Sequence, residues 1–146
     1  MCVMNTVVID TGVFVAGVFW RHEPHLCLKA WLCGIILPVM TDEIMTEYER
    51  VLERVKREQE FSAEIGPWLE ALWNSALWVT PVALGRQVCR DAKDDKFIEA
   101  ALAAGARAVI ARDPDLTILQ KPFGIAMQTP RAWLATLTRP QRRALD

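Results

Sequence analysis

Short apolar runs alternate with longer amphipathic segments along this chain, and few folds accommodate that alternation. The run TVVI at residues 6–9 is short, β-branched and apolar, which is typical of a strand buried on both faces of a sheet. Strands that alternate with helices predict an α/β fold with a mainly parallel sheet. The predicted strands are residues 6–9, 35–40, 77–82, 107–111 and 125–128.

The segments between these strands carry the usual start and stop signals of helices. Thr41 is a suitable N-cap, and the acids Asp42 and Glu43 in the first turn interact favourably with the helix dipole. Gly34 and Gly105 are suitable residues to end two other helices. The predicted helices are residues 25–33, the segment after Thr41, residues 63–74, residues 94–104, a segment that opens at Pro114, and residues 130–137.

Length and composition indicate one soluble domain that fills residues 1–146. Of these residues, 52% are hydrophobic and 24% are charged, which is ordinary for a compact protein with a substantial core. No apolar stretch is long enough to span a bilayer. The N-terminus lacks a basic start followed by a long apolar region and a cleavage site, so we expect a cytoplasmic protein.

Cysteine and histidine spacing gives little support for a zinc site. No CxxC pair occurs, and no histidine pair lies at zinc-finger spacing. Without an export signal we expect the thiols to be reduced and to serve in packing. His22 and His25 flank a proline in a predicted loop, where exposed side chains are the simpler expectation. The four cysteines are Cys2, Cys27, Cys33 and Cys89.

Four acids, far apart in sequence, lie at or just beyond the ends of the apolar runs. They are Asp10, Glu47, Asp94 and Asp113. Each alone is unremarkable, because such residues often cap helices or face solvent. In a parallel sheet, however, every strand delivers its carboxyl end to the same edge, so these carboxylates would meet in one crevice. Like charges held close together repel unless a cation compensates them, and hard oxygen ligands suit Mg²⁺ or Mn²⁺. The pattern therefore predicts metal-assisted chemistry on phosphates.

The overall charge is compatible with a nucleic-acid substrate once these acids are set aside. The chain has 17 basic and 18 acidic residues, a net charge of −1, which by itself is low for a nucleic-acid binder. Without the four acids, 14 acids remain against 17 bases. Four arginines gather near the C-terminus and are either a solvated helix end or a patch that contacts phosphates. They are Arg131, Arg139, Arg142 and Arg143.

The order and spacing of the motifs that hold these acids resemble the PIN domain family. The resemblance covers residues 7–137 and is greatest to the toxins of VapBC-type toxin–antitoxin pairs. It implies a three-layer α/β/α sandwich and a metal-dependent endoribonuclease that cuts single-stranded RNA. It also implies a homodimer inhibited by an antitoxin protein. The motifs are VVIDTGV at 7–13, Glu47-Tyr48, DDKF at 94–97 and RDPDL at 112–116.

The resemblance also assigns roles to individual residues. Asp10, Glu47, Asp94 and Asp113 match the first to fourth acids of the family, which bind Mg²⁺ or Mn²⁺ and are the catalytic residues. Where the family often has Asn or Ser, this chain has Gly12. The polar support that such a side chain gives would be missing at that position.

Neighbouring polar residues provide alternatives for these roles. Glu43 lies one helical turn before Glu47 and is a rival for the second acid, although we expect it to act on the helix N-terminus instead. Asp95 and Asp115 are alternatives for the third and fourth acids, and Thr11 can supply a hydroxyl near the first. The candidate contacts to the scissile phosphate are Lys96 and Arg112.

Other α/β functions fit the sequence less well. A haloacid-dehalogenase-like phosphatase would have a second Asp two residues after the first, where Gly12 stands. A receiver would have an acceptor Asp after a middle strand, and residues 77–82 are followed by none nearby. Neither GxGxxG nor GxxxxGK[ST] occurs, which argues against a nucleotide-binding protein. A PIN nuclease that is not a toxin, an RNA-processing factor and a non-catalytic interaction module remain as alternatives.

Hydrophobic composition predicts self-association. The mean hydropathy is +0.14 and the chain has six tryptophans, which indicates more apolar surface than a chain of this length easily buries. Trp68 and Trp73 lie in one predicted helix and are candidates for an exposed apolar patch. We therefore expect a homodimer.

Overall fold

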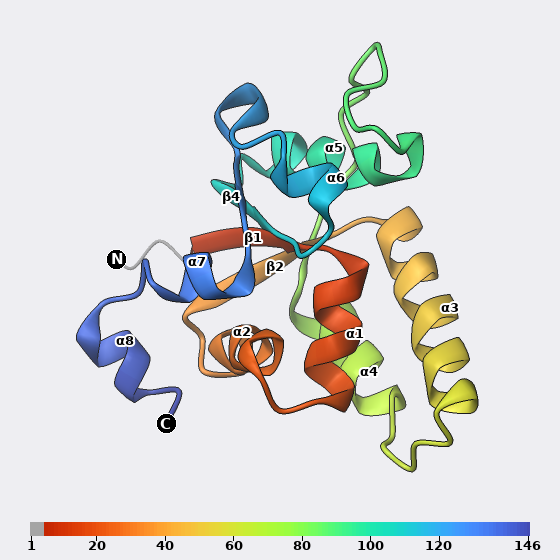
Figure 1. Cartoon of the computed structure of the whole chain (residues 1–146), viewed down its shortest axis with the longest axis vertical. Helices are drawn as coiled ribbons and strands as arrows, with labels where there is room; N and C mark the ends of the chain where they lie inside the picture. The colour runs from red at the N-terminus through yellow and green to blue at the C-terminus, as the bar shows by residue number, and fades with distance from the viewer. Residues whose placement is uncertain (1–4) are drawn as a thin grey trace.

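A five-stranded, all-parallel sheet forms the centre of the protein, as the computed structural model of residues 5–146 shows (Figure 1). The strand order is β3-β2-β1-β4-β5, so the chain builds outward from β1 on one side and then returns to its other side. This arrangement confirms the predicted α/β fold. The strands are β1 (Asn5–Ile9), β2 (Ile36–Met40), β3 (Leu77–Trp78), β4 (Ala108–Ile110) and β5 (Ala126–Gln128).

The predicted strands are found, but the prediction for residues 77–82 is too long. β3 spans only Leu77–Trp78 and pairs with Val39 and Met40 of β2. One further hydrogen bond, from the Val79 amide to the Met40 carbonyl, continues the ladder before it stops. Pro81 follows, and proline has no N–H to donate to a neighbouring strand.

The first helix, α1 (Thr11–Phe19), is absent from the sequence prediction. Its sequence, TGVFVAGVF, is apolar, β-branched and interrupted by two glycines, so it shows none of the polar–apolar period of a surface helix. The structure explains the composition, because the residues from Val13 to Gly17 are buried. The Asp10 side chain caps the helix by accepting a hydrogen bond of 2.7 Å from the Val13 amide.

The other helices begin and end close to the predicted residues. The predicted 63–74 helix starts only at Gly66, where Pro67 occupies the first turn, a position that suits proline. The last predicted helix ends at Leu134, and a further short helix follows it. The helices are α2 (Glu23–Leu32), α3 (Asp42–Glu58), α4 (Gly66–Ser75), α5 (Asp95–Ala104), α6 (Pro114–Thr117), α7 (Pro130–Leu134) and α8 (Arg139–Arg143); Ala92–Asp94 and Pro122–Gly124 form 3-10 turns.

Helices cover both faces of the sheet, which gives the three-layer α/β/α sandwich (Figure 1). α5 packs on one face against β1, β2 and β4. α1 and α2 pack against each other on the opposite side, where α2 and α4 contact β2. α3 contacts both α1 and α5, so it closes the side of the sandwich near the carboxyl ends of the strands.

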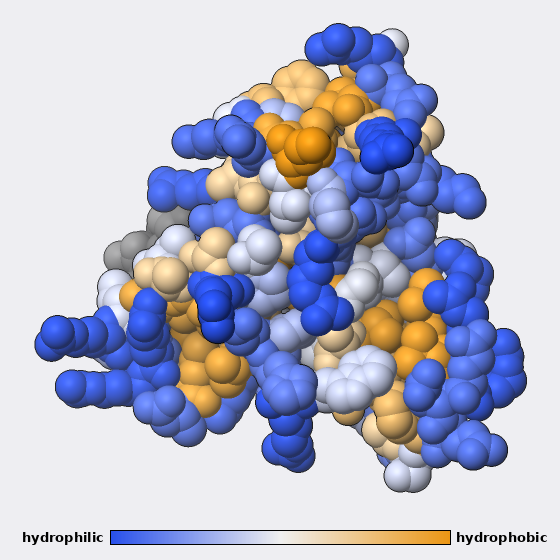
Figure 2. Space-filling model, in the orientation of Figure 1, coloured by the Kyte–Doolittle hydropathy of each residue, from blue (hydrophilic) through white to orange (hydrophobic). Residues whose placement is uncertain are grey.

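The tryptophans divide between the core and the surface differently from the prediction. Trp68 is half-buried and packs edge-on against Phe14 at 6.4 Å between ring centroids, so it does not belong to an exposed patch. Trp73 is 55% exposed and stacks on Trp78 at 4.4 Å, as an apolar surface residue. Figure 2 shows a mostly hydrophilic face with separate hydrophobic patches, near α6, between α1 and α3, and beside α8.

The smaller expectations about thiols, histidines and membranes have separate outcomes. None of the described cysteines, Cys27, Cys33 and Cys89, pairs with another, and Cys2 lies outside the described residues. His22 is exposed, but His25 lies within α2 and its Nδ1 is 2.8 Å from the Gly17 carbonyl oxygen, so the loop prediction is wrong for His25. Within residues 5–146, none of the helices has the length and apolarity that a bilayer span requires.

Candidate active site

The four acids that the sequence singles out line one pocket at the carboxyl edge of the sheet. Asp10 directly follows β1, and its amide donates a hydrogen bond of 2.9 Å to the Ile110 carbonyl at the end of β4. This bond brings the two strand ends together. The cavity has a volume of about 340 Å³ and is lined by Asp10, Thr11, Gly12, Glu47, Asp94, Phe97, Arg112 and Asp113.

Asp10 is the most buried of these acids, at 4% exposed. Its Oδ1 accepts the hydrogen bond from Val13 N at 2.7 Å, and its Oδ2 accepts one from Arg112 N at 3.3 Å. Burial raises the pKa of Asp10 from 3.8 to about 6, although amides of Val13, Arg112 and Asp113 lower it. The carboxylate is therefore fixed in direction and is costly to ionise without a cation nearby.

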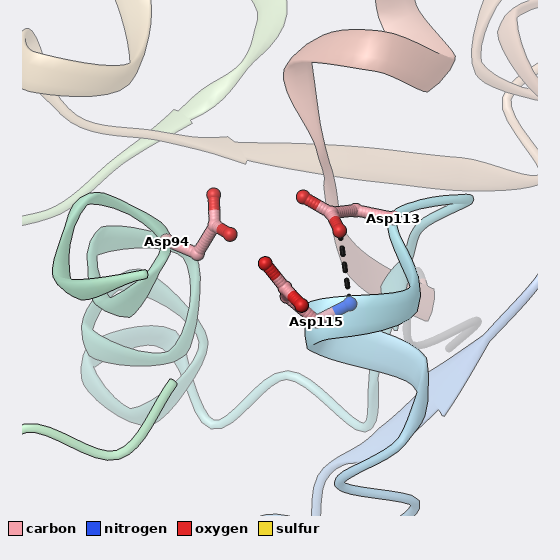
Figure 3. A group of neighbouring side chains, drawn as sticks. All are labelled: Asp94, Asp113 and Asp115. Carbon is pink, nitrogen blue, oxygen red and sulfur yellow. Dashed lines mark hydrogen bonds between the residues drawn. The ribbon is translucent and has the colours of Figure 1, made fainter. Parts of the chain in front are cut away.

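Asp94, Asp113 and Asp115 form the closest acidic cluster, with one oxygen from each within 4.8 Å of the others (Figure 3). Asp94 comes from the turn before α5, Asp113 is the N-cap of α6, and Asp115 lies in the first turn of α6. Asp113 Oδ1 caps α6 by accepting a 2.9 Å hydrogen bond from Asp115 N. Asp115, an alternative for the fourth acid in the sequence, is thus a neighbour of both the third and the fourth.

Asp94 shows the electrostatic cost of this cluster most clearly. Its pKa is raised from 3.8 to about 7 by burial and by the charges of Asp113 and Asp91, while Lys96 lowers it. Among the described residues, the Asp94 Oδ2 is buried and has no hydrogen-bond partner. A buried carboxylate oxygen without a donor is unfavourable, and a divalent cation is a partner that would remove this penalty.

Glu47 on α3 is held in the pocket by two side chains. The Thr11 hydroxyl donates a hydrogen bond to Glu47 Oε2, and Lys96 Nζ lies 2.9 Å from Glu47 Oε1. Lys96 is only 6% exposed and also donates to the Lys93 carbonyl at 2.5 Å. Lys96 is therefore an internal cation of the site, whereas Arg112 is exposed at the pocket rim, where a phosphate can reach it.

Glu43 and Asp95, the alternatives for the second and third acids, do not line the acidic pocket. Glu43 is exposed and lines a separate cavity with Thr80 and Pro81. Asp95 accepts hydrogen bonds from Val88 N at 3.1 Å and Cys89 N at 2.7 Å. Burial alone would raise the pKa of Asp95, but the hydrogen bonds that it accepts outweigh burial and lower it. Asp95 therefore fixes the loop before α5 and does not face the other acids.

One acid near the site, Asp91, has no pattern in the sequence that singles it out. It accepts a 3.0 Å hydrogen bond from Lys93 N and so caps the 3-10 turn that carries Asp94. The spacing Asp-x-x-Asp is the only signal in the sequence, and it is too common to identify a site. The negative charge of Asp91 nevertheless contributes to the raised pKa of Asp94.

A larger cavity, of about 790 Å³, lies at the opposite edge of the sheet and has a different character. Among the described residues, its lining includes Asn5 at the start of β1, Arg107 before β4 and Lys121, but no Asp or Glu. Without carboxylates, and with two cations in its lining, this cavity is poorly suited to Mg²⁺ or Mn²⁺. The acidic pocket, although smaller, is therefore the candidate active site.

Comparison with known proteins agrees with this assignment of the fold. The family model described as PIN domain matches residues 6–115, a segment that contains all four acids of the pocket and Asp115. No curated protein and no solved structure matches the chain.

Proposed function

The chain belongs to the PIN domain family, and on this premise we propose that it is a metal-dependent endoribonuclease that cleaves single-stranded RNA. PIN domains are generally nucleases, so a nucleic-acid substrate follows from the family. One observation supports the proposal most: acids from four separate segments, Asp10, Glu47, Asp94 and Asp113, line one pocket. Like charges repel, so four carboxylates in one pocket lower the stability of the fold unless a cation binds there. A purely structural role does not account for this arrangement.

The residues in the pocket fit Mg²⁺ or Mn²⁺. Carboxylate oxygens are the ligands that these hard cations prefer. Asp94, Asp113 and Asp115 offer oxygens within 4.8 Å of one another, and the buried Asp94 Oδ2 has no hydrogen-bond donor among the described residues. When bound, such an ion lowers the pKa of a water ligand and neutralises charge on the phosphate. We propose Asp94 and Asp113 as its ligands, with Asp10 and Glu47 completing the set and Asp115 at its margin.

The protein's own residues hold these groups in position before substrate arrives. Asp10 is fixed by the amides of Val13 and Arg112, and Glu47 by the Thr11 hydroxyl and Lys96. Preformed geometry of this kind avoids reorganisation during the reaction. Arg112 projects from the rim, so it would contact the phosphate of a bound strand and screen it from the acids.

We further propose that the nuclease is the toxin of a toxin–antitoxin pair, acting in the cytoplasm as a homodimer. The resemblance of the four motifs to VapBC-type toxins supports this role. The exposed Trp73, with its neighbour Trp78, supports burial of apolar surface against another chain. The antitoxin would act by covering the acidic pocket or by placing a cation against its carboxylates.

An assay on RNA tests the nuclease proposal. Wild type, free of any partner, is incubated with single-stranded and double-stranded RNA in Mg²⁺, in Mn²⁺ and in EDTA. We expect cleavage of the single strand only with metal. Asp10→Asn should reduce cleavage more than about 100-fold, beyond the 10–100-fold that loss of a residue supporting a ligand costs. Asp42→Asn is the matched control, because Asp42 is exposed at the start of α3 and outside the pocket.

A cellular experiment separates the toxin from a nuclease of another role. Expression of wild type should stop growth, expression of Asp10→Asn should not, and co-expression of the neighbouring gene product should restore growth. Metal-dependent cleavage without any growth arrest would favour a PIN nuclease outside toxin–antitoxin systems or an RNA-processing factor. If wild type cleaves none of the RNAs in the presence of metal, the nuclease proposal itself is wrong.

A further inference from the structure

A second pocket adjoins the acidic one and shares a wall with it. This cavity has a volume of about 240 Å³ and is lined by Ala16, Trp20, His22, Pro24 and Arg112. Arg112 also lines the acidic pocket, so this one residue borders both cavities. We call the cavity around Trp20 the Trp20 pocket.

Helix α1 runs from one pocket to the other. Gly12 lines the acidic pocket, while Ala16 and Trp20 line the Trp20 pocket. Residues spaced by four lie on the same side of a helix, so Gly12, Ala16 and Trp20 mark one path along α1, in which Gly12 and Trp20 are exposed and Ala16 is nearly buried. Two helical turns, about 11 Å, separate the ends of this path. A chain that crosses the acidic pocket along α1 would therefore reach Trp20 with its next units.

The indole of Trp20 is held in place while part of its ring is exposed. Trp20 is 41% exposed and closes α1 by donating its backbone N–H to the Ala16 carbonyl. Its ring meets Phe61 edge-on at 5.3 Å and Phe19 at 6.1 Å between centroids. An aromatic ring fixed by its neighbours offers stacking surface at a low cost in conformational entropy.

The polar residues of the Trp20 pocket are hydrogen-bond donors or cations, and none of the described residues in its lining is an acid. His22 is exposed at the start of α2, and its side chain makes no capping hydrogen bond there. Arg112 supplies a guanidinium. This lining contrasts with the acidic pocket beside it. The volume of the Trp20 pocket is below the ~300–1,000 Å³ of sites for drug-sized ligands, so the pocket suits a single flat ring system.

From this arrangement, and resting on the proposed ribonuclease function, we infer that the Trp20 pocket binds one nucleobase of the single-stranded substrate, next to the phosphate that is cut. The base stacks on Trp20 and accepts a hydrogen bond from His22, while Arg112 contacts the phosphate between the two pockets. Single-stranded RNA is recognised in this way, by unstacked bases on aromatic side chains. Base-paired RNA cannot present a base in this manner, so the pocket would also select single strands.

Direct binding tests the inference apart from cleavage. Anisotropy of a labelled single-stranded RNA is measured with Mg²⁺ in the cleavage-deficient Asp10→Asn background. We expect Trp20→Ala to weaken binding about 10- to 100-fold, the range found for the loss of one stacked base, and Trp20→Phe to retain most of the affinity. His22→Ala should give a smaller loss and tests the pocket without removing an aromatic ring. Phe123→Ala, which removes an exposed aromatic side chain that does not line the pocket, should bind as the parent does.

An abasic substrate identifies the contact itself. One abasic site is moved along the RNA, and the position where it weakens binding to the parent protein marks the bound base. In Trp20→Ala, an abasic site at that same position should cause no further loss of RNA affinity, because the indole on which the base stacks is already absent. An abasic penalty that persists in Trp20→Ala, or equal affinity of Trp20→Ala and parent, overturns the inference. If RNA binding is unchanged but Trp20→Ala loses an inhibiting partner protein, the pocket belongs to that partner instead.

The two proposals fail in different ways. If wild type cleaves RNA with metal, and Trp20→Ala binds RNA equally well and cleaves it at the same positions, the base-pocket proposal is wrong and the nuclease proposal stands. Wild type that neither binds nor cleaves RNA rejects both.

Discussion

The Tyr48 hydroxyl donates a hydrogen bond to the carbonyl oxygen of Ile9, the last residue of β1. Tyr48 is 1% exposed and stacks on Phe14 of α1 at 4.3 Å. Tyr48 follows Glu47 and Ile9 precedes Asp10, so one contact fixes two acids of the pocket relative to each other. Burial and the nearby charges of Asp10 and Glu47 raise the pKa of Tyr48, which keeps the hydroxyl protonated as a donor.

Tyr48→Phe should therefore affect both stability and the site. It keeps the stacked ring but leaves the Ile9 carbonyl without this donor, which should cost about 1–2 kcal/mol in the free energy of unfolding. Urea denaturation measures that loss. We also expect weaker Mn²⁺ binding, because Glu47 loses its fixed position. A variant as stable as wild type would show that water or another donor satisfies the Ile9 carbonyl.

Glu47 and Glu43 provide a paired comparison on one helix. Glu47 lines the acidic pocket, whereas Glu43 is exposed beside Thr80 and Pro81. We predict that Glu47→Gln weakens Mn²⁺ binding at least about 10-fold, and that Glu43→Gln leaves it unchanged. Isothermal titration with the metal gives both affinities. The reverse order of effects would assign the second acid to Glu43.

The stability of the metal-free protein should fall as pH rises. The pKa of Asp10 is raised to about 6 and that of Asp94 to about 7, both from 3.8. Each therefore binds its proton more tightly in the folded state. The stability that this gives is complete below pH ~4 and is lost as pH rises through about 6 and 7. For the buried Asp10, the difference corresponds to roughly 3 kcal/mol.

A divalent metal replaces these protons on the carboxylates. The stabilisation that the metal gives should therefore increase with pH, whereas the stability of the metal-free protein decreases. In thermal unfolding, Mn²⁺ should raise the midpoint strongly at pH 8 and little at pH 5, relative to EDTA. Asp10→Asn, which cannot ionise at this position, should show a smaller loss of stability between pH 5 and 8. Equal effects of Mn²⁺ at the two pH values would contradict the placement of the metal among these acids.

Lys96 should be more important to the metal-free protein than to the metal-bound one. Lys96→Met removes the cation 2.9 Å from Glu47 and leaves that carboxylate among other acids. Breaking a fully buried pair costs about 3–5 kcal/mol; Glu47 is 21% exposed, so we expect roughly 1–3 kcal/mol. Urea denaturation in EDTA should show the loss, and Mn²⁺ should recover part of it. Lys93→Met, at an exposed position, is the control.

Gly17→Ala tests the close approach of α1 and α2. A Cβ at Gly17 would lie 2.7 Å from Leu28 Cδ1 and 2.8 Å from the Pro24 carbonyl oxygen. Alanine favours a helix by about 1 kcal/mol over glycine, but overpacking costs about 1–3 kcal/mol. Because backbone of α2 is among the atoms struck, we expect net destabilisation. Gly12→Ala, where the nearest atom outside the neighbouring residues is Asp10 Oδ1 at 3.8 Å, should be stabilising or neutral.

The sequence predicts the elements whose signals are local. β1 and β4 are short β-branched runs, and α3 has an N-cap at Thr41 that accepts a hydrogen bond from Ile44 N at 3.2 Å. It does not predict α1, because a helix buried on nearly all sides has no polar face to give it a period. It overestimates β3 because pairing with β2, rather than the apolar run itself, decides where an edge strand stops.

The acids of the pocket follow from topology, but their surroundings do not. Asp10 and Asp113 end neighbouring parallel strands, so their approach follows from the predicted fold. Glu47 faces the pocket and Glu43 does not because of the rotation of α3 about its axis. Asp95 is turned away from Asp94 because it accepts hydrogen bonds from the loop before α5. The burial of Lys96 against Glu47 depends on the packing of α5 against α3, which no local pattern specifies.

The pairing of β1 with β4 has a consequence for the protein while it is being made. Val7 lies opposite Pro38 of β2 on one side and Ala108 of β4 on the other, so β1 can pair with β2 early, but its β4 partner is translated about one hundred residues after it. A nascent chain that still hides Asp113 in the ribosome has neither the second wall of the acidic pocket nor the strand that supports Asp10. Truncated products of interrupted translation would be inert. The proposed nuclease would therefore be silent until synthesis has passed its fourth strand.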